Sequence, residues 1–367
     1  MILIGDDLDE GREEQGSGGQ LDILVYEHVT GGGLAGRDLP ASWAVEGRAI
    51  RRTLASDFAR VAGVRVTMPL DARLADEPGP WTVIRIGPDQ GVEVVAMLAS
   101  RADYTVLIAP ETDGILENLT RTIADRGGRS LGPTAAAVSL TADKFRLGEH
   151  LLRLGLRTPS VRLVRPRAGL PRDAAYPAVL KPVDGAGAGD TFFIESADDP
   201  LVGFFPNDIG LLQPWIQGEP RSATFLNLDG GGPILVGVGT QRLDREGGRI
   251  VYQGGAILDD SMPVDHPTRL AVARIPGLNG LVGVDYVHDP KTGRATLIEI
   301  NPRPTTSIVG LVAVLGAGRL AGIWLGTERI ASNRSVEPLA RPASPLTFGA
   351  DGSIRSNESP LDRTPRS

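Results

Sequence analysis

The sequence contains no cysteine, only four histidines and no long apolar run. Without cysteine there can be no disulfide, no thiolate metal ligand and no cysteine nucleophile; this suits a reducing compartment, so we expect a cytoplasmic protein. The opening segment MILIG runs directly into acids and lacks a basic flank, which argues against a signal peptide. We expect no membrane association, because a membrane span needs about eighteen consecutive apolar residues.

Basic residues are outnumbered by acidic ones. The 367-residue chain has a formal net charge of -7. Much of the excess acid lies in residues 1–20, where DDLDEGREEQGSGGQ has too few apolar side chains to bury, so we expect a disordered acidic tail there. This charge balance offers no broadly basic surface, and we predict no nucleic-acid partner.

Strand-like and helix-like segments alternate between residues 21 and 133. LDILVY is a short β-type run, and WAVEGRAIRRTLASDFARVAG repeats apolar residues at helical spacing up to Gly63. Three strand-like and two helix-like segments follow: VRVTM, WTVIRI, DYTVLIA, GVEVVAMLAS and ILENLTRTIADRGG. The alternation predicts an α/β domain with a parallel sheet covered by helices.

A second unit begins at residue 134 with TAAAVSLTADKFRLGEHLLRLGL, which we predict to be helical through residue 156. The chain up to residue 332 then consists mainly of strand-like pieces joined by Gly, Pro and Asp turns. This pattern favours an antiparallel or mixed sheet in an α+β domain. Residues 333–367 are rich in Pro and Ser, and we predict a flexible C-terminal tail.

Residues 179–191, VLKPVDGAGAGDT, place a lysine at the end of an apolar run and three alternating glycines after it. A Walker loop needs the lysine after the glycines, and a dinucleotide-binding loop needs G-x-G-x-x-G opening a helix, so neither pattern fits. The remaining functional interpretation is that Lys181 meets a phosphate while the glycine hairpin closes over it with backbone N–H groups. A flexible surface turn explains the glycines alone equally well.

GLVGVDYVHD and ATLIEINPRPTTS are predicted to be two strands of a hairpin, with PKTG as the turn. Strand alternation allows Asp285 to share one face with Glu299 and Asn301, with Arg303 two residues further on. Such a row of acids and an amide inside apolar strands needs cations, and oxygen ligands without His or Cys select Mg²⁺ or Mn²⁺. Taken singly, each acid also fits an ordinary solvated strand residue.

Together these features resemble the ATP-grasp superfamily. The matching segments follow the family's order between residues 141 and 303: TADKF, VLKP, DGAGAGD, LLQPWIQGE, GVGTQRL, GVDYV and EINPR. The resemblance implies an ATP-grasp fold, with a pre-ATP-grasp domain at residues 21–133 and an ATP-grasp domain at residues 134–332 whose two α+β subdomains clamp ATP. It places the lid subdomain near residues 158–215.

The resemblance also implies a role for each matched residue. The implied ATP-binding residues are Lys144, Lys181, Gly185, Gly187, Gly189, Gln213, Trp215, Ile216 and Glu219. The implied ligands of two Mg²⁺ or Mn²⁺ ions are Asp285, Glu299 and Asn301. Lys181 and Arg303 are the implied catalytic residues, because they would offset charge on the transferring phosphoryl group. The adenine segment departs from the family pattern, since many members have an acid in place of Gln213 and lack Pro214.

Three further segments, VYEHVTGGGLAG, IAPETDGIL and VYQGGAI, resemble the superfamily's carboxylate–amine ligases, a group that includes the tyramine–glutamate ligases of methanofuran and methylofuran biosynthesis. This closer resemblance implies substrate contacts by Gly31, Gly32, Gly33, Glu111, Gln241 and Arg303. The three glycines also fit a tight turn after the first strand, and Glu111 also fits an acid at a helix start. The four histidines show no ligand spacing, and we assign them no chemistry.

The implied reaction is ATP-dependent amide formation. A substrate carboxylate takes the γ-phosphoryl group of ATP, and an amine then displaces phosphate from the acyl phosphate; no enzyme nucleophile is needed, which fits the missing cysteine. The substrates would be small molecules, with glutamate as the acid and tyramine or tyrosine as the amine, and a homodimer is the commonest assembly. The alternatives are a ligase of another pathway, a non-catalytic ATP-binding module, and a nicotinamide or flavin oxidoreductase.

Overall fold

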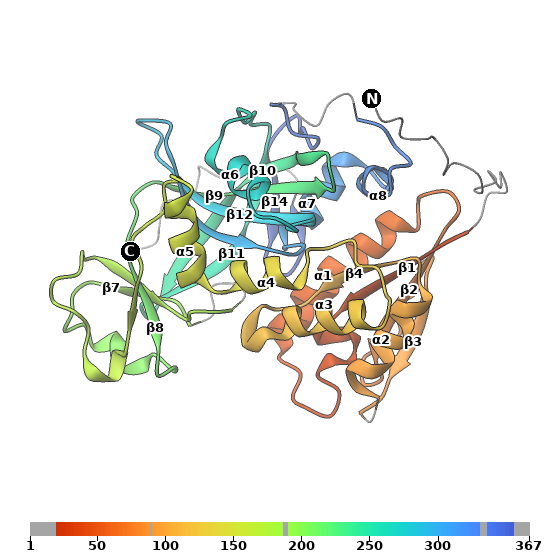
Figure 1. Ribbon diagram of the computed structural model, residues 1–367, viewed down its shortest axis with the longest axis horizontal. Coiled ribbons are helices and arrows are strands. Elements are labelled where there is room, and N and C mark those ends of the chain that lie inside the picture. Colours follow the sequence, from red (N-terminus) through yellow and green to blue (C-terminus); the bar gives the residue numbers. More distant parts are fainter. Residues whose placement is uncertain (1–19, 89, 186–189, 331–335, 356–367) are drawn as a thin grey trace, which may run out of the picture.

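The computed structural model describes residues 20–88, 90–185, 190–330 and 336–355. Two sheets organise the molecule: a four-stranded sheet in the N-terminal part and an eleven-stranded sheet in the remainder. In Figure 1 the first lies at the lower right and the second at the top, with its strands β7 and β8 projecting to the left. The predicted succession of an α/β unit and an α+β unit is confirmed.

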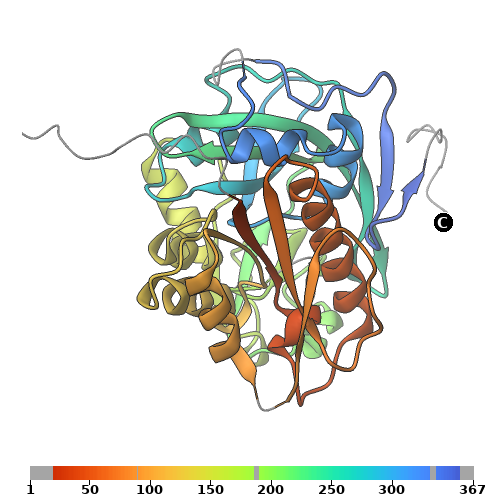
Figure 2. The same ribbon diagram turned by 90° about the vertical axis from the view of Figure 1, so that its right-hand side faces the viewer.

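The N-terminal sheet is parallel, in the order β3–β2–β1–β4, as predicted. Its strands and helices are β1 Leu21–Glu27, α1 Ala41–Phe58, β2 Val64–Asp71, β3 Thr82–Ile86, α2 Gly91–Arg101, β4 Tyr104–Ile108 and α3 Ile115–Asp125. Ile23 and Val25 pack in the cluster that contains α1 residues, whereas Leu24 and Tyr26 pack with α2 and α3. Helices therefore cover both faces of the sheet (Figure 2), which explains the nearly continuous apolar run of β1.

The helical stretch predicted over residues 134–156 is two helices, α4 Ala135–Ala142 and α5 Lys144–Arg153. Asp143 breaks it: its backbone is extended, and its carboxylate accepts hydrogen bonds from the N–H groups of Phe145 and Arg146. The carboxylate thus caps a new helix start, which outweighs the helical periodicity of the flanking residues. The break places Lys144 at the first residue of α5, beside the later strands.

The large sheet has the order β13–β12–β9–β10–β11–β7–β6–β8–β5, and its neighbouring strands pair antiparallel. Its long strands and the helices that pack on them are β9 Glu219–Leu228, β10 Gly232–Glu246, β11 Arg249–Leu258, α6 Pro267–Ala273, β12 Gly280–His288, β13 Ala295–Asn301, α7 Ser307–Leu315 and α8 Arg319–Trp324. Among the described residues, no helix has both the length and the apolar content that a membrane span requires.

The short strands at one end of this sheet form a small body with its own apolar core. They are β5 Arg162–Val164, β6 Ala178–Lys181, β7 Phe192–Ile194 and β8 Gly210–Pro214. Leu180, Phe192 and Leu212 belong to that core, which is separate from the two main clusters. Within the described ranges, its strands pair with the long strands at one position, Phe192 of β7 opposite Arg249 of β11. We call this body and the two residues that follow β8, that is residues 162–185 and 190–216, the lid.

Residues 336–355 do not form the flexible tail that we predicted. Strand β14 Leu346–Gly349 pairs antiparallel with β11 and with β15 Ile354–Arg355. Phe348 is only 4% exposed and lies in the core cluster that joins the two sheets, together with Ile257 and Ile308. The Pro- and Ser-rich composition misled the prediction, because one buried aromatic residue and a short strand suffice to anchor the segment.

Replacing Phe348 by alanine is therefore expected to lower the free energy of unfolding by about 3–5 kcal/mol, the usual cost of emptying an aromatic core site. Urea unfolding followed by circular dichroism measures it. Ile354→Ala is the matched control, because Ile354 is 46% exposed on the neighbouring strand β15. Equal unfolding midpoints for the two variants would mean that this segment contributes nothing to the core.

Candidate active site

A row of polar side chains crosses the hairpin of β12 and β13, as the strand alternation predicts. Asp285 lies directly opposite Glu299 in the antiparallel register, and Gly283 lies opposite Asn301. The Asn301 amide donates a hydrogen bond of 3.1 Å to Asp285 Oδ2. The two acids and the amide thus face one side of the sheet and lie within contact of one another.

The pKa values of the two carboxylates shift in opposite directions because their surroundings differ. Burial, followed by the repulsion of Glu299, raises the pKa of Asp285 well above its ordinary value. Burial would also raise the pKa of Glu299, but the ammonium groups of Lys144 and Lys181 outweigh it and lower that pKa. Two adjacent buried carboxylates are costly unless cations face them, and of the two Asp285 has the higher affinity for a proton.

Two lysines from different elements converge on this pair. Lys144 Nζ lies 3.9 Å from Glu299 Oε2 and donates a 2.9 Å hydrogen bond to the backbone oxygen of Gly185. Lys181 is 5% exposed at the end of β6, and burial lowers its pKa to about 8 despite the attraction of Glu299. Gly185, the first glycine of the run, is therefore held near the acids through Lys144. Gly187 and Gly189 lie outside the described residues.

A cavity of about 200 Å³ opens between the lid and the long strands, beside this cluster. Lys181, Asp285, Glu299, Asn301 and Arg303 line it, and so do Gln213, Trp215 and Ile216 at the end of the lid. The cavity thus brings together most of the residues predicted to bind ATP and metal. Its mixture of apolar walls and converging polar groups is typical of a small-molecule site.

Glu219, predicted to contact a ribose, is not among the residues that line the cavity. Its side chain is 49% exposed and forms an ion pair of 2.8 Å with Arg221, which also pairs with Asp260. The neighbouring Gly218 and Pro220 do line the cavity. Glu219 therefore lies at the rim, where the structure gives it a protein partner.

Arg303 is held by an acid from the N-terminal part of the chain. Its Nε atom lies 2.9 Å from Glu111 Oε1, and both side chains are buried. Burial opposes the guanidinium charge, but the carboxylates of Glu111 and Glu46 outweigh it and hold the pKa of Arg303 above its ordinary value. Glu111 does stand at a helix start, as one of the two expectations had it, because it precedes the short 3-10 helix Thr112–Gly114. Its carboxylate makes no capping hydrogen bond there and orients Arg303.

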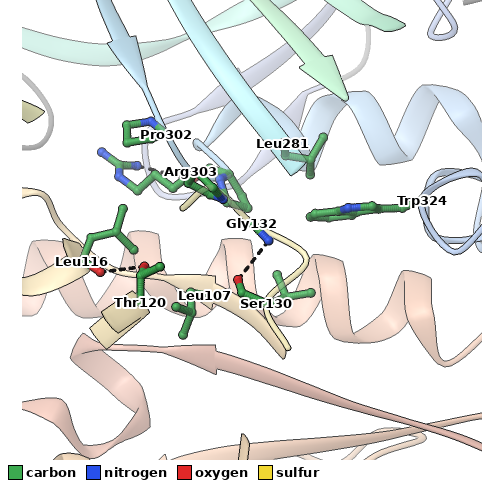
Figure 3. Close-up of a pocket in the computed structure, with 12 residues that line it drawn as sticks. Leu107, Leu116, Thr120, Ser130, Gly132, Leu281, Pro302, Arg303 and Trp324 are labelled. Atoms are coloured by element: carbon green, nitrogen blue, oxygen red, sulfur yellow. Dashed lines mark hydrogen bonds between the residues drawn. The ribbon is translucent and has the colours of Figure 1, made fainter. Parts of the chain in front are cut away.

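Behind Arg303 lies a second, much smaller cavity, of about 10 Å³, at the junction of the two sheets. Figure 3 shows Arg303 between Pro302 and residues Leu116 and Thr120 of α3, with Trp324 on the other side. The space is lined mainly by apolar groups and has room for about one water molecule. It is a packing gap, and it leaves Arg303 fixed from behind.

Gln241, predicted to contact substrate, donates a 2.9 Å hydrogen bond from its amide to Asp285 Oδ1. It also lines the large cavity. Together with Asn301 it gives both oxygens of Asp285 an amide partner. The role that the structure supports is therefore orientation of Asp285.

The three glycines after β1 are enclosed by protein and do not line the large cavity. A Cβ atom on Gly31 would lie 2.9 Å from the Tyr26 ring, and one on Gly33 would lie 2.2 Å from the His28 ring. Gly32 has a φ of 94°, which other residues rarely adopt. The structure thus favours the tight-turn alternative over a substrate-binding loop.

Several cavity residues were not found from the sequence. Glu46 comes from α1, Ser222 from β9 and Tyr252 from β11, and Thr305, Thr306 and Ser307 come from the chain after β13. Only Tyr252 lies in a segment that the resemblance singled out, VYQGGAI. The others are single polar residues whose approach to the cavity depends on how the two sheets pack.

The donor set suits a hard divalent cation. Two carboxylates and an amide, backed by lysines, offer the oxygen atoms that Mg²⁺ and Mn²⁺ prefer. Burial and the repulsion of Glu299 raise the pKa of Asp285, and a cation beside the pair would offset both effects. Within the described residues there is no cluster of three or more His, Cys, Asp or Glu side chains arranged for a metal, so a bound ion would take further oxygen ligands from its partner molecule.

Comparison with known proteins agrees with this geometry. An ATP-grasp domain model matches residues 141–307, and a pre-ATP-grasp domain model matches residues 64–138. A curated relative, the tyramine–L-glutamate ligase of Methanocaldococcus fervens, is 26% identical over 300 residues, which cover 79% of this chain and 89% of the relative.

Solved structures share the fold. An ATP-grasp superfamily protein from Archaeoglobus fulgidus has a TM-score of 0.62 at 22% identity, covering 84% of this chain and 88% of the other. A carboxyaminoimidazole ribonucleotide synthase from Aspergillus clavatus, solved with ATP, has a TM-score of 0.62 at 17% identity, covering 90% and 82%. With two consecutive domain models and a site of matching geometry, this chain belongs to the ATP-grasp superfamily and is an ATP-dependent ligase that forms carbon–nitrogen bonds.

Proposed function

We propose that this protein joins a small carboxylate to an amine through an acyl phosphate, with L-glutamate as the acid and tyramine or tyrosine as the amine. The curated relative named for tyramine and L-glutamate supports this choice of substrates. The observation that carries the ligase mechanism is the pairing of Asp285 and Glu299 on adjacent strands, facing Lys144 and Lys181 in one cavity. We place the reaction in methylofuran-type cofactor biosynthesis, in the cytoplasm.

In this proposal the ATP triphosphate lies over the acid row. Asp285, Glu299 and Asn301 would hold two Mg²⁺ or Mn²⁺ ions, which supply charge neutralisation of the phosphate oxygens when bound. Lys144 and Lys181, which face Glu299, would bind the same phosphates. Adenine lies toward the lid, where Gln213, Trp215 and Ile216 line the cavity.

Arg303 orients the group being transferred. Its guanidinium lines the cavity two residues beyond Asn301, and Glu111 fixes it from behind at 2.9 Å. A rigid cation there stabilises the charge on the phosphoryl group without rearranging during the reaction. The γ-phosphoryl group passes to the substrate carboxylate, ADP leaves, and the amine nitrogen then attacks the acyl carbon as phosphate departs.

Water must be kept from the acyl phosphate, since it would hydrolyse it. Val179 and Trp215 of the lid form one wall of the cavity, and Trp215 packs edge-on against Phe193 with the ring centroids 5.2 Å apart. Arg245 of β10 stacks over the Phe193 ring at 3.4 Å. These contacts tie the lid to the long strands, which supports exclusion of water from the reacting groups.

The proposal is tested by measuring amine-dependent ADP formation with L-glutamate held constant across a panel of amines, followed by mass analysis of the product. We expect ADP release with tyramine or tyrosine and a product whose mass equals the sum of both substrates less water. Activity only with a different acid would keep the ligase reaction and discard the pathway. No ADP release with any acid and amine would refute the proposed reaction.

A further inference from the structure

Glu46 is a carboxylate on the wall of the large cavity to which the mechanism assigns no role. It projects from α1, which belongs to the N-terminal part of the chain, whereas most of the cavity belongs to the large sheet. Thr306, at the start of α7, donates its hydroxyl hydrogen to Glu46 Oε1. One oxygen of Glu46 is therefore held in place, and the other is left for a ligand.

The position of α1 depends on the residue after Glu46. Gly47 lies against the buried carboxylate of Glu27, and a Cβ atom on it would come within 2.5 Å of the Glu27 Cδ atom. The glycine lets α1 approach β1 closely at this turn of the helix. Glu46 is thus carried into the cavity by a fixed backbone rather than by a mobile loop.

Glu46 differs from the other carboxylates near the site in its charged partners. Arg303 pairs with Glu111, while Lys144 and Lys181 face Glu299. Within the described part of the chain, Glu46 forms no ion pair with Lys, Arg or His. The acid lies close enough to Tyr252 and Arg303 to act on both: burial first, then Asp285 and Glu46, raises the pKa of Tyr252, and Glu46 helps to raise that of Arg303.

We propose that Glu46 binds the ammonium group of the amine substrate. The inference rests on the proposed ligase function and names the residue that selects its second substrate. An aliphatic amine carries a positive charge at neutral pH, because its pKa is about 10. A half-buried carboxylate with a fixed orientation is the complementary group, because its neighbour Arg303 forms its ion pair with Glu111 and leaves Glu46 without one among the described residues. The same neighbour places Glu46 near the acyl group that the amine must reach.

The decisive variant is Glu46→Gln, which keeps the size of the side chain and an oxygen for the Thr306 hydroxyl but removes the charge. We expect KM for tyramine to rise at least about tenfold, the usual cost of losing a charged hydrogen bond, while KM for ATP and for L-glutamate changes little. Glu149→Gln is the matched control, because Glu149 is exposed on α5 and outside the cavity. Steady-state ADP release supplies all three constants.

Trapping the acyl phosphate with hydroxylamine separates the two half-reactions. Hydroxylamine is largely uncharged at neutral pH and needs no carboxylate, so we expect Glu46→Gln to form glutamyl hydroxamate at close to the wild-type rate. A loss of hydroxamate formation, or a rise in KM for L-glutamate instead of tyramine, would assign Glu46 to the acid substrate and overturn the proposal. An unchanged KM for tyramine would overturn it as well.

Thr306→Val tests whether Glu46 acts only as a link between the two parts of the chain. It removes the hydrogen bond but leaves the charge, so we expect a smaller rise in KM for tyramine than in Glu46→Gln. Equal effects on stability and on every KM in both variants would indicate a purely structural link. If the wild-type protein releases no ADP with any acid, in the presence of hydroxylamine or of amines, the ligase proposal fails and this inference fails with it.

Discussion

Replacing Glu299 by glutamine is expected to reduce ADP release by roughly a hundredfold or more, the scale on which enzymes lose activity when charge-stabilising groups are removed. Glutamine keeps the shape of the side chain but loses the negative charge that faces Lys144 and Lys181. It also offers a neutral oxygen where a divalent cation needs a carboxylate. The loss should appear in kcat and should not be recovered at saturating ATP.

The fold should survive this substitution. Glu299 repels Asp285 and attracts two ammonium groups, so removing its charge relieves one unfavourable interaction and loses two favourable ones, which partly cancel. We expect a thermal midpoint close to that of the wild type and of the exposed control Glu149→Gln. Full ADP release by a folded Glu299→Gln protein would show that the acid row does not bind the metal and the triphosphate.

The hairpin that carries the acids could be predicted because its information is local. A turn sequence, PKTG, fixes where the chain reverses, and the two-residue period then decides which side chains share a face. The exact register could not be predicted in this way: next to the turn His288 lies opposite Ala295, and a β-bulge between Asp285 and Tyr286 then shifts the pairing by one residue and brings Asp285 opposite Glu299. The parallel N-terminal sheet could also be predicted from local patterns, because clear helical segments separate its strands along the chain.

The errors lie where a distant contact or a single cap decides the structure. Asp143 ends one helix and starts another through two hydrogen bonds. The spacing of apolar residues, from which one continuous helix was predicted, does not reveal such a cap. Phe348 anchors a segment of tail-like composition. For Glu111 and Gln241 the resemblance implied substrate contacts but could not show their protein partners, which are Arg303 for Glu111 and, within the large sheet, Asp285 for Gln241.

The position of Glu46 in the cavity could not be predicted from the sequence either. In the sequence it is one glutamate within a helix that also carries several arginines, and nothing in its spacing distinguishes it. Its approach to the cavity needs α1 to lie against both β1 and α7, which involves residues about 260 positions apart. The adenine end is different, because Gln213, Trp215 and Ile216 follow one another along a strand end that the family resemblance had located.

The few lysines of this chain are concentrated at the candidate active site. Its three lysines stand among 38 basic residues, and two of them, Lys144 and Lys181, face the acid row. Arginine binds carboxylates and phosphates through a planar fork, whereas lysine is a compact point charge that can sit at the end of a buried strand. The site therefore uses lysine where most of the molecule uses arginine.

Replacing Lys181 by methionine is expected to lower kcat/KM for ATP by roughly 10²–10³-fold, since the charge it removes lies at the phosphate end of the cavity. The variant should stay folded, with an unfolding midpoint near that of the wild type, because burial already disfavours the charge and lowers the pKa of Lys181 to about 8. Methionine fills nearly the same volume, and Lys144 remains to face Glu299. Stopped assays of ADP at several ATP concentrations measure the loss.

Lys291→Met is the matched control, because Lys291 is the remaining lysine and lies exposed in the turn between β12 and β13. It makes the same chemical change on the same hairpin as the acid row but outside the cavity, so it should leave kcat/KM for ATP unaltered. If both variants keep wild-type values, Lys181 does not contact ATP. If only Lys181→Met loses activity while its unfolding midpoint holds or rises, the charge serves the nucleotide rather than the fold.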